Sequence, residues 1–297
     1  MSKSKKLIFF GTEDFSAPSL EALLNAGWPV TAVITKPDSR GGRGQKAIVP
    51  KVKAIAAKAG IELLQPDKVD EINPKIAEIK PDYGVLVAYG KIIPQSTIDL
   101  FPGGIINVHP SLLPKYRGPA PIEAPILNAD KATGISLMRL NAGMDEGPVF
   151  AQLRVELNGS ETRPELYAQL AKTGADFLLE RLEAIIEGWT TPKPQVDSNA
   201  TYTKLLKKAD GRLDFGHPAE VLERQVRAYA GWPRSSAEVF GQKIIVVEAR
   251  VAKNQQDGDL VIKCAPGFLE IQELIAPSGR KMSGKDFISG YSHSHNQ

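Results

Sequence analysis

An asparagine and a histidine, two residues apart, form the pair in this chain best suited to chemistry. The stretch GIINVHPSLLPKYRGPAP, residues 104–121, runs from two isoleucines into Asn107 and His109, and a loop with four prolines follows. Alternate residues of a strand point to the same side, and open α/β sheets bind ligands outside the carboxyl ends of their strands. An amide can donate to a developing oxyanion, and an imidazole can transfer protons near neutral pH. We therefore predict that both side chains face a reaction site, against the alternative of a buried structural histidine.

A third residue, Asp145, could orient His109 and stabilise its charged form. It lies in NAGMDEGPVF, after a predicted strand and between Gly143 and Gly147. Two strand ends of one sheet can meet at the same edge, which would bring Asp145 to His109. A plain turn acid remains the alternative. In the loop after His109, Arg117 is interpreted equally well as a solvated cation, so it receives no catalytic role.

Other kinds of site have weak support in the sequence. The first strand-to-helix turn, FFGTEDFSAP, lacks the further glycines of a dinucleotide fingerprint and carries two acidic residues that would repel a pyrophosphate. The chain has one cysteine and four histidines, two of which lie near its end. We therefore expect neither a nucleotide cofactor nor a metal site.

The elements that must position these residues alternate between strand and helix. Apolar runs at 7–10, 29–35, 83–89 and 105–109 are separated by segments with helical spacing. Strands that are apolar throughout and alternate with helices indicate a mostly parallel sheet covered on both faces. Two further strands and a helix over 162–188 complete a Rossmann-like α/β catalytic domain, residues 1–188.

The pattern changes after this domain. Residues 189–205 contain prolines and little apolar content, which predicts a linker. From 206 to 297, one helix precedes consecutive short apolar runs separated by turn residues. This order is typical of a small antiparallel barrel, and we predict an OB-like β-barrel domain there.

Composition restricts the setting of the protein. The 297 residues are 42% hydrophobic and 24% charged, with a net charge of +3. A single cysteine, Cys264, permits no internal disulfide, which suits a reducing compartment. No apolar stretch approaches the ~20 residues that cross a bilayer, and the apolar run near the start is too short for a signal peptide. We expect a cytoplasmic protein that does not engage a membrane.

One segment is strongly basic. Between Lys36 and Lys51 the chain has five lysines or arginines against Asp38 alone, together with three glycines. Such a segment buries little surface by itself. We predict a loop without regular structure that becomes ordered on a polyanionic partner.

Several of these motifs together resemble a known family. NVHPSLLPKYRGPAPIEAPI with the downstream GMDEGPV closely resembles the formyltetrahydrofolate-dependent transferases. FFGTEDFSAPSLEAL, KPDSRGGRGQK, DGRLDF and RQVRA are similar to the branch of that family that formylates methionyl-tRNA. The resemblance extends through nearly the whole chain.

The resemblance implies a reaction and a set of residues. The formyl donor is 10-formyltetrahydrofolate, the acceptor is the α-amino group of methionyl-initiator tRNA, and the product supports translation initiation. The catalytic set of the family falls on Asn107, His109 and Asp145. Its folate-binding segment falls on Ser111, Leu112, Leu113 and Pro114. The reaction requires no metal and no covalent enzyme intermediate, and we expect no obligate protein partner.

The tRNA side of the prediction rests on the basic loop and on residues 206–297. We expect Arg40, Arg43 and Lys46 to contact tRNA phosphates, with a solvated loop as the alternative. A second enzyme hypothesis is formylation of an amino sugar nucleotide, because relatives share the catalytic domain. A third is a folate- or RNA-binding module without turnover, against which the set of Asn107, His109 and Asp145 counts.

Overall fold

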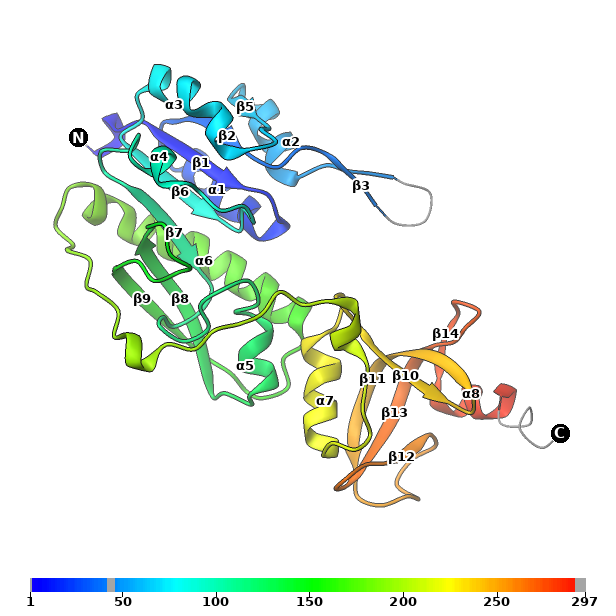
Figure 1. The fold of residues 1–297 in the computed structure, drawn as a ribbon. Helices are drawn as coiled ribbons and strands as arrows, with labels where there is room; N and C mark the ends of the chain where they lie inside the picture. The colour runs from blue at the N-terminus through cyan, green and yellow to red at the C-terminus, as the bar shows by residue number, and fades with distance from the viewer. Residues whose placement is uncertain (1, 42–45, 292–297) are drawn as a thin grey trace. The chain divides into compact units, whose positions relative to one another are not determined.

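The computed structural model describes residues 2–41 and 46–291, and Figure 1 shows its fold. Two compact units divide the chain, and each is built from separate segments. Unit 1 consists of Met1–Pro121, Ala132–Glu156 and Tyr167–Thr203. Unit 2 consists of Ile122–Lys131, Leu157–Leu166 and Lys204–Gln297.

Unit 1 is organised around a seven-stranded sheet. Its strands are β1 (Leu7–Gly11), β2 (Val30–Ile34), β5 (Glu62–Leu64), β6 (Tyr83–Val87), β7 (Ile105–His109), β8 (Ala132–Arg139) and β9 (Val149–Glu156). They lie in the order β5-β2-β1-β6-β7-β8-β9. The pairs from β5 to β7 are parallel, whereas β8 and β9 are antiparallel to their neighbours. The predicted Rossmann-like, mostly parallel sheet is confirmed.

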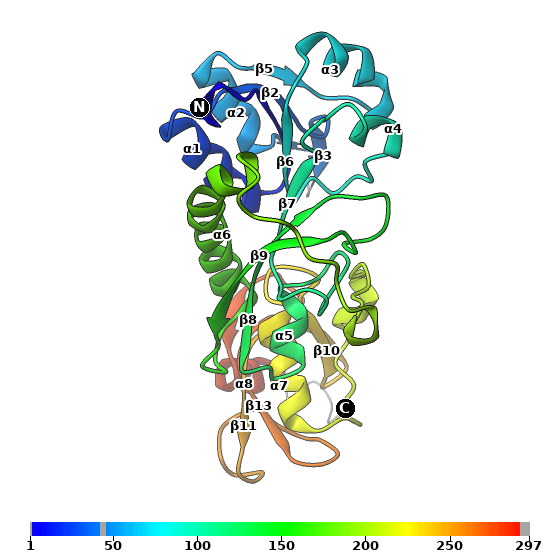
Figure 2. The same ribbon diagram turned by 90° about the vertical axis from the view of Figure 1, so that its left-hand side faces the viewer.

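Helices cover both faces of this sheet. The helices are α1 (Ala17–Asn25), α2 (Lys51–Ala59), α3 (Asn73–Ile79), α4 (Gln95–Ile98) and the long α6 (Arg163–Ile186). Figure 2 shows α1, α2 and α6 on one side and α3 and α4 on the other. Ile8 and Phe10 of β1 pack on the side of α3 and α4. On the α6 side, Gly174 lies so close to Val108 and Ile135 that an added Cβ would come within 3.2–3.4 Å of them. Both faces of the sheet are therefore covered by packed side chains, as the uniformly apolar strands require.

The basic segment after β2 forms a hairpin in part. β3 (Ser39–Gly41) and β4 (Lys46–Ile48) pair antiparallel. At the base of the hairpin, Asp38 accepts hydrogen bonds from Lys53 Nζ at 2.7 Å and Gln65 Nε2 at 2.9 Å. These bonds hold the pKa of the Asp38 carboxyl below its usual value. The expectation of a loop without regular structure was wrong, because backbone pairing and the Asp38 anchor need no apolar side chains.

Unit 2 contains a second, smaller sheet. Its elements are α5 (Glu123–Leu127), α7 (Ala219–Ala228), β10 (Ser235–Val239), β11 (Gln242–Ala252), β12 (Val261–Lys263), β13 (Phe268–Ile275), β14 (Lys281–Ser283) and α8 (Gly284–Tyr291). The strands pair antiparallel in the order β10-β11-β13-β12, with β14 also on β13. Leu222 of α7 and Phe287 of α8 are buried in one core with the strands. This confirms the predicted small antiparallel β-domain, whereas α8 was not predicted.

Short 3-10 helices connect several of these elements. They span Ser2–Ser4, Asp14–Ser16, Val69–Ile72, Asp197–Asn199 and Lys208–Gly211.

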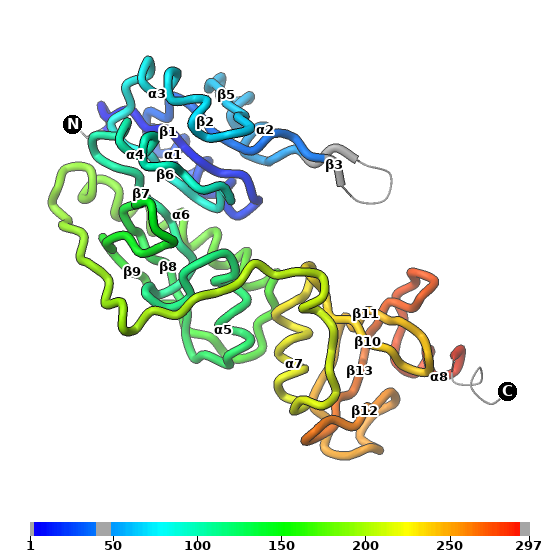
Figure 3. Tube along the Cα trace, viewed as in Figure 1, coloured from blue at the N-terminus to red at the C-terminus, as the bar shows by residue number. Residues whose placement is uncertain are grey.

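The segment after α6, residues 189–203, is here called the return segment. Figure 3 shows it leaving the end of α6 and running beside β9. Val149 and Lys193 exchange two backbone hydrogen bonds of 2.8 Å, and Arg117 N donates to Thr201 O at 2.9 Å. The return segment belongs to unit 1 up to Thr203. The predicted limits of 1–188, 189–205 and 206–297 treat each domain as contiguous, whereas unit 2 also takes in α5.

Candidate active site

The carboxyl end of β7 carries two polar side chains in an otherwise apolar strand. Asn107 and His109 are each only 5% exposed. β7 lies between β6 and β8, with Asn107 opposite Met138 and His109 opposite Ser136. Because they are two residues apart on one strand, both side chains project from the same face. A buried amide and a buried imidazole each need a polar partner.

Both side chains meet the carboxylate of Asp145, in the turn between β8 and β9. Asn107 Nδ2 donates to Asp145 Oδ1 at 3.3 Å, and His109 Nδ1 lies 3.7 Å from Asp145 Oδ2. The backbone N–H of Gly118 donates to Oδ2 at 2.9 Å. The side chain of Asp145 is 18% exposed. The structure therefore brings together the three residues that the sequence singled out.

The second ring nitrogen of His109 faces a backbone carbonyl. His109 Nε2 lies 3.0 Å from Tyr116 O. A carbonyl oxygen only accepts, so this contact requires a proton on Nε2. Nδ1 then faces a carboxylate, which also only accepts. A backbone carbonyl and a carboxylate therefore face the two ring nitrogens of His109.

The turn that presents Asp145 is flanked by two glycines, one of which the backbone requires. Asp145 has a φ of 51°, in the left-handed region. A Cβ on Gly147 would come within 1.9 Å of the carbonyl oxygen of Arg139, and one on Gly143 within 1.8 Å of Glu146 Oε1. Gly147 is thus required by the close approach of the β8 backbone, whereas at Gly143 the flexible Glu146 side chain could move aside.

The segment predicted to bind folate, 111–114, is held firmly against β8 and β9. Ser136 Oγ donates to Ser111 O at 2.6 Å, and Gln152 Nε2 donates to Leu113 O at 2.8 Å. The side chains of Ser111 and Leu113 are buried, whereas Leu112 and Pro114 are half-buried. The Ser111 hydroxyl donates to Lys115 O at 2.6 Å. Of the four residues, Leu112 and Pro114 are the ones whose side chains reach the surface.

Arg117 lies inside the protein, which the interpretation as a solvated cation did not anticipate. It is 1% exposed, and its guanidinium donates to Asp197 Oδ1 at 2.7 Å and Tyr202 Oη at 3.0 Å. Burial lowers the pKa of Arg117, but these hydrogen bonds raise it by more, so the group stays charged. An arginine in a proline-rich loop was visible in the sequence. Its partners in the return segment had no sequence signal.

The residues predicted to bind tRNA belong to the β3–β4 hairpin. The backbone of Arg40 lies in β3 opposite Ala47, and that of Lys46 lies in β4 opposite Gly41. Arg43 lies outside the described residues. Their contact with tRNA stays a prediction.

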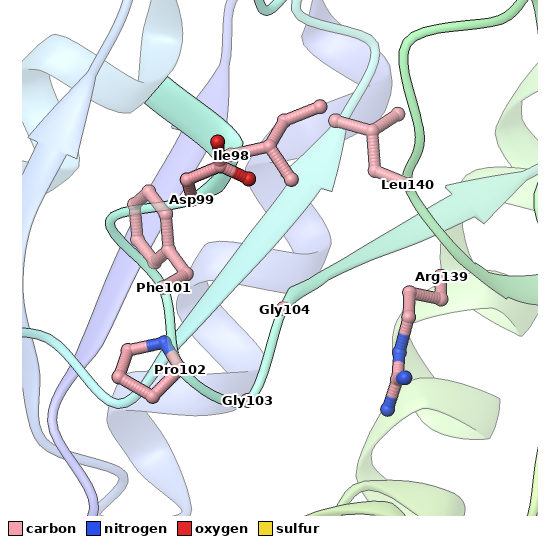
Figure 4. Close-up of a pocket in the computed structure, with 8 residues that line it drawn as sticks. All are labelled: Ile98, Asp99, Phe101, Pro102, Gly103, Gly104, Arg139 and Leu140. Atoms are coloured by element: carbon pink, nitrogen blue, oxygen red, sulfur yellow. The ribbon is translucent and has the colours of Figure 1, made fainter. Parts of the chain in front are cut away.

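A pocket of about 290 Å³ lies at the opposite end of β7. Figure 4 shows its lining, in which Gly104 precedes β7 and Arg139 ends β8. It is therefore separate from the Asp145 cluster, which lies at the carboxyl end of β7. In the part of the chain that the structure describes, no group of three or more histidine, cysteine or acidic residues could hold a metal ion. Nor is any helix there long and apolar enough to cross a membrane.

Comparison with known proteins identifies related families. The model of the formyl transferase family matches residues 5–182, and that of the formyl transferase C-terminal domain matches residues 205–292. The methionyl-tRNA formyltransferase of Thermodesulfovibrio yellowstonii is 35% identical, covering 97% of this chain and 96% of the relative. The protein of the same name from Acetivibrio thermocellus is 38% identical over 96% of each chain.

Solved structures share the fold at lower identity. HypX from Aquifex aeolicus, in complex with tetrahydrofolic acid, superposes with a TM-score of 0.66 at 17% identity and covers 97% of this chain. This chain spans about half, 47%, of that HypX chain. An N-formyltransferase from Helicobacter canadensis, in complex with folinic acid and dTDP-3-aminofucose, has a TM-score of 0.66 at 19% identity and covers 93% of this chain and 97% of its own. With family models matching both parts and relatives above 30% identity over nearly their full length, this chain belongs to the formyl transferase family and, within it, to the methionyl-tRNA formyltransferases.

Proposed function

We propose that this protein transfers the formyl group of 10-formyltetrahydrofolate to the α-amino group of methionyl-initiator tRNA, and that it does so in the cytoplasm. The observation that carries the proposal is the meeting of Asn107 and His109 at the Asp145 carboxylate, in a chain of this family. Formyl transfer between two nitrogens passes through a tetrahedral oxyanion. It therefore needs an oxyanion donor and a proton carrier, and it needs no nucleophile from the protein.

Asn107 is the oxyanion donor in this proposal. An asparagine amide has two N–H donors, and Asp145 Oδ1 accepts one of them at 3.3 Å. That contact orients the amide and leaves the second N–H for the oxyanion. Asn107 is nearly buried, so the donor acts in a site with little competing water, where such hydrogen bonds are strongest.

His109 holds and moves the proton. The amine loses a proton as the new bond forms, and the departing folate nitrogen gains one. The Asp145 carboxylate, 3.7 Å from Nδ1, stabilises the charged ring while the proton is held. Nδ1 faces Asp145, so the proton passes at Nε2, and the substrate must take the place of the Tyr116 carbonyl that lies 3.0 Å from Nε2 in this structure.

The loop that follows His109 suits a formyl-folate as co-substrate. 10-Formyltetrahydrofolate supplies the formyl group. The half-buried side chains of Leu112 and Pro114 offer apolar surface on the loop that follows His109. Leu113 N donates to Ser136 Oγ and Gln152 Nε2 donates to Leu113 O, which keeps this loop in place, so the surface is formed before binding.

Incubation of the protein with 10-formyltetrahydrofolate and methionyl-initiator tRNA tests the reaction. The expected product is formyl-methionine on the tRNA. A parallel reaction offers a dTDP-linked amino sugar as acceptor. Formylation of the sugar alone would replace the proposal by the amino sugar reaction, and the absence of product from both acceptors would leave a binding module.

The tRNA contacts of the β3–β4 hairpin need their own test. A variant with Arg40, Arg43 and Lys46 changed to alanine removes three positive charges and leaves the Asp38 anchor of the hairpin intact. We expect a higher KM for methionyl-tRNA with an unchanged KM for the folate. The slope of log KM against log salt concentration should fall by about one for each tRNA phosphate that the variant no longer binds. An unchanged salt slope would remove the hairpin from tRNA binding.

A further inference from the structure

A glutamine outside the predicted site, Gln195, connects the Asp145 turn to the return segment. Its Nε2 donates to the backbone carbonyls of Asp145 and Gly147, each at 2.8 Å. Its Oε1 accepts from Arg117 Nε at 3.0 Å. All of these groups belong to unit 1. One amide thus ties two carbonyls of the turn to a buried guanidinium.

The chemistry of its partners gives the Gln195 amide a single orientation. Carbonyl oxygens only accept hydrogen bonds and a guanidinium only donates them. The amide nitrogen must therefore face the turn, and the amide oxygen must face Arg117. Arg117 is itself fixed by Asp197 and Tyr202 of the return segment. The return segment therefore holds Arg117, Arg117 holds the amide oxygen of Gln195, and the amide nitrogen of Gln195 holds the turn.

The turn requires such support because its backbone is strained. Asp145 is not a glycine, and its φ of 51° lies in the left-handed region that residues with a side chain rarely adopt. The backbone conformation at Asp145 decides where its carboxylate lies. The 3.3 Å contact with Asn107 and the 3.7 Å approach to His109 both depend on that conformation.

We propose that Gln195 is a positioning residue for formyl transfer, because it holds the Asp145 turn so that the carboxylate meets His109 and Asn107. Arg117 in turn orients the Gln195 amide. The inference rests on the proposed function and adds Gln195 and Arg117, which contact neither the oxyanion nor the transferred proton. The competing explanation is that Gln195 only provides an acceptor for a buried arginine. The first explanation depends on the amide nitrogen, which contacts the turn, and the second depends on the amide oxygen, which contacts Arg117.

Gln195→Glu separates the two ends. The carboxylate keeps an acceptor for Arg117, but it donates nothing to Asp145 O and Gly147 O and instead repels both oxygens. We expect kcat to fall about 10- to 100-fold, as for other small displacements of a catalytic group, with little change in KM for either substrate. The pH–rate profile should move, because the Asp145 carboxylate shifts relative to His109 and the variant adds a negative charge beside the turn.

The control is Gln255→Glu, which makes the same chemical change in unit 2, where Gln255 Nε2 donates to Val261 O at 2.7 Å. It should leave kcat and the pH–rate profile unchanged. Wild-type kcat and an unmoved profile in a folded Gln195→Glu variant would overturn the inference, as would a lower Tm alone. Absence of formyl transfer by the wild-type protein would instead refute the proposed function.

Arg117→Lys supplies a second line of evidence should Gln195→Glu not fold. It keeps a positive charge near Asp197 and loses the planar Nε–H that Gln195 accepts. We expect a smaller loss of kcat and a shift of the pH–rate profile to lower pH, because no negative charge is added and the Asp145 carboxylate moves away from His109. Because both residues act on one turn, the double variant should be no slower than Gln195→Glu alone. Fully additive losses would overturn the role of Arg117.

Discussion

Two aspartates of this protein accept several hydrogen bonds in tight turns, yet their partners differ in kind. Asp257, between β11 and β12, accepts from both terminal nitrogens of Arg250 at 3.1 and 3.2 Å and from Lys253 N at 2.8 Å. The hydrogen bonds from Arg250, followed by that from Lys253, lower the pKa of Asp257 from 3.8 to about 2. Asp145 instead meets an amide, a backbone N–H and an imidazole.

The difference shows which kind of partner suits catalysis. A guanidinium stays charged at any pH at which the protein is folded, so Asp257 has one charge state and one role, the closing of a turn. The partner of Asp145 that can carry charge is an imidazole, which gains and loses a proton near neutral pH. The energy of the Asp145–His109 pair therefore changes when the proton moves, and that coupling is useful in a reaction.

Asp145→Asn tests the comparison at the aspartate whose partner can gain and lose a proton. The variant keeps the shape of the side chain and removes the charge that stabilises the His109 imidazolium. We expect kcat to fall about 10²- to 10⁴-fold, the usual contribution of proton transfer by a positioned side chain. The pH–rate profile should shift to lower pH, measured with both substrates saturating. Full activity with an unshifted profile would reduce Asp145 to a turn residue.

Asn107→Leu examines the other partner of the same carboxylate. Leucine fills a similar volume and donates nothing, so the oxyanion loses one donor. Removal of one such donor typically lowers kcat by about 10²- to 10³-fold. The pH–rate profile should keep its shape, because the His109–Asp145 pair remains. A shifted profile would mean that Asn107 acts through Asp145 rather than on the oxyanion.

The sheet and the Asn107–His109 pair could be predicted because both follow from periodicity. Apolar runs such as Leu7–Gly11 and Ile105–His109 are buried as the pattern requires. The period of two placed Asn107 and His109 on one face, from residues that are close in sequence. The end of β8 does not itself place Asp145, because β8 runs antiparallel to β7 and ends beside the amino end of β7. The turn after β8 brings the Asp145 carboxylate back to Asn107, a contact that spans 38 residues.

The supports of the site escaped prediction because their contacts join residues far apart in sequence. Gln195 lies 50 residues from Asp145, and Arg117 lies 80 residues from Asp197. Side-chain hydrogen bonds to backbone carbonyls follow no period, and a proline-containing polar segment resembles a linker in composition. The β3–β4 pairing escaped for a related reason, since it is made by the backbone in a polar segment.

Asp257→Asn makes in unit 2 the substitution that Asp145→Asn makes in unit 1, and we expect it to leave kcat unchanged. Its effect should appear in stability as a function of pH. A carboxyl whose folded pKa is about 2, below the 3.8 of the unfolded chain, stabilises the fold above 3.8 and loses that contribution as pH falls towards 2. The difference in Tm between wild type and variant should therefore be constant above about pH 5 and shrink between about pH 4 and 2. The side chain of Arg250 is 41% exposed, so the difference should be small. If Asp257→Asn slowed formyl transfer as much as Asp145→Asn, the distinction between a permanently charged and a titratable partner would not separate structural from catalytic aspartates in this protein.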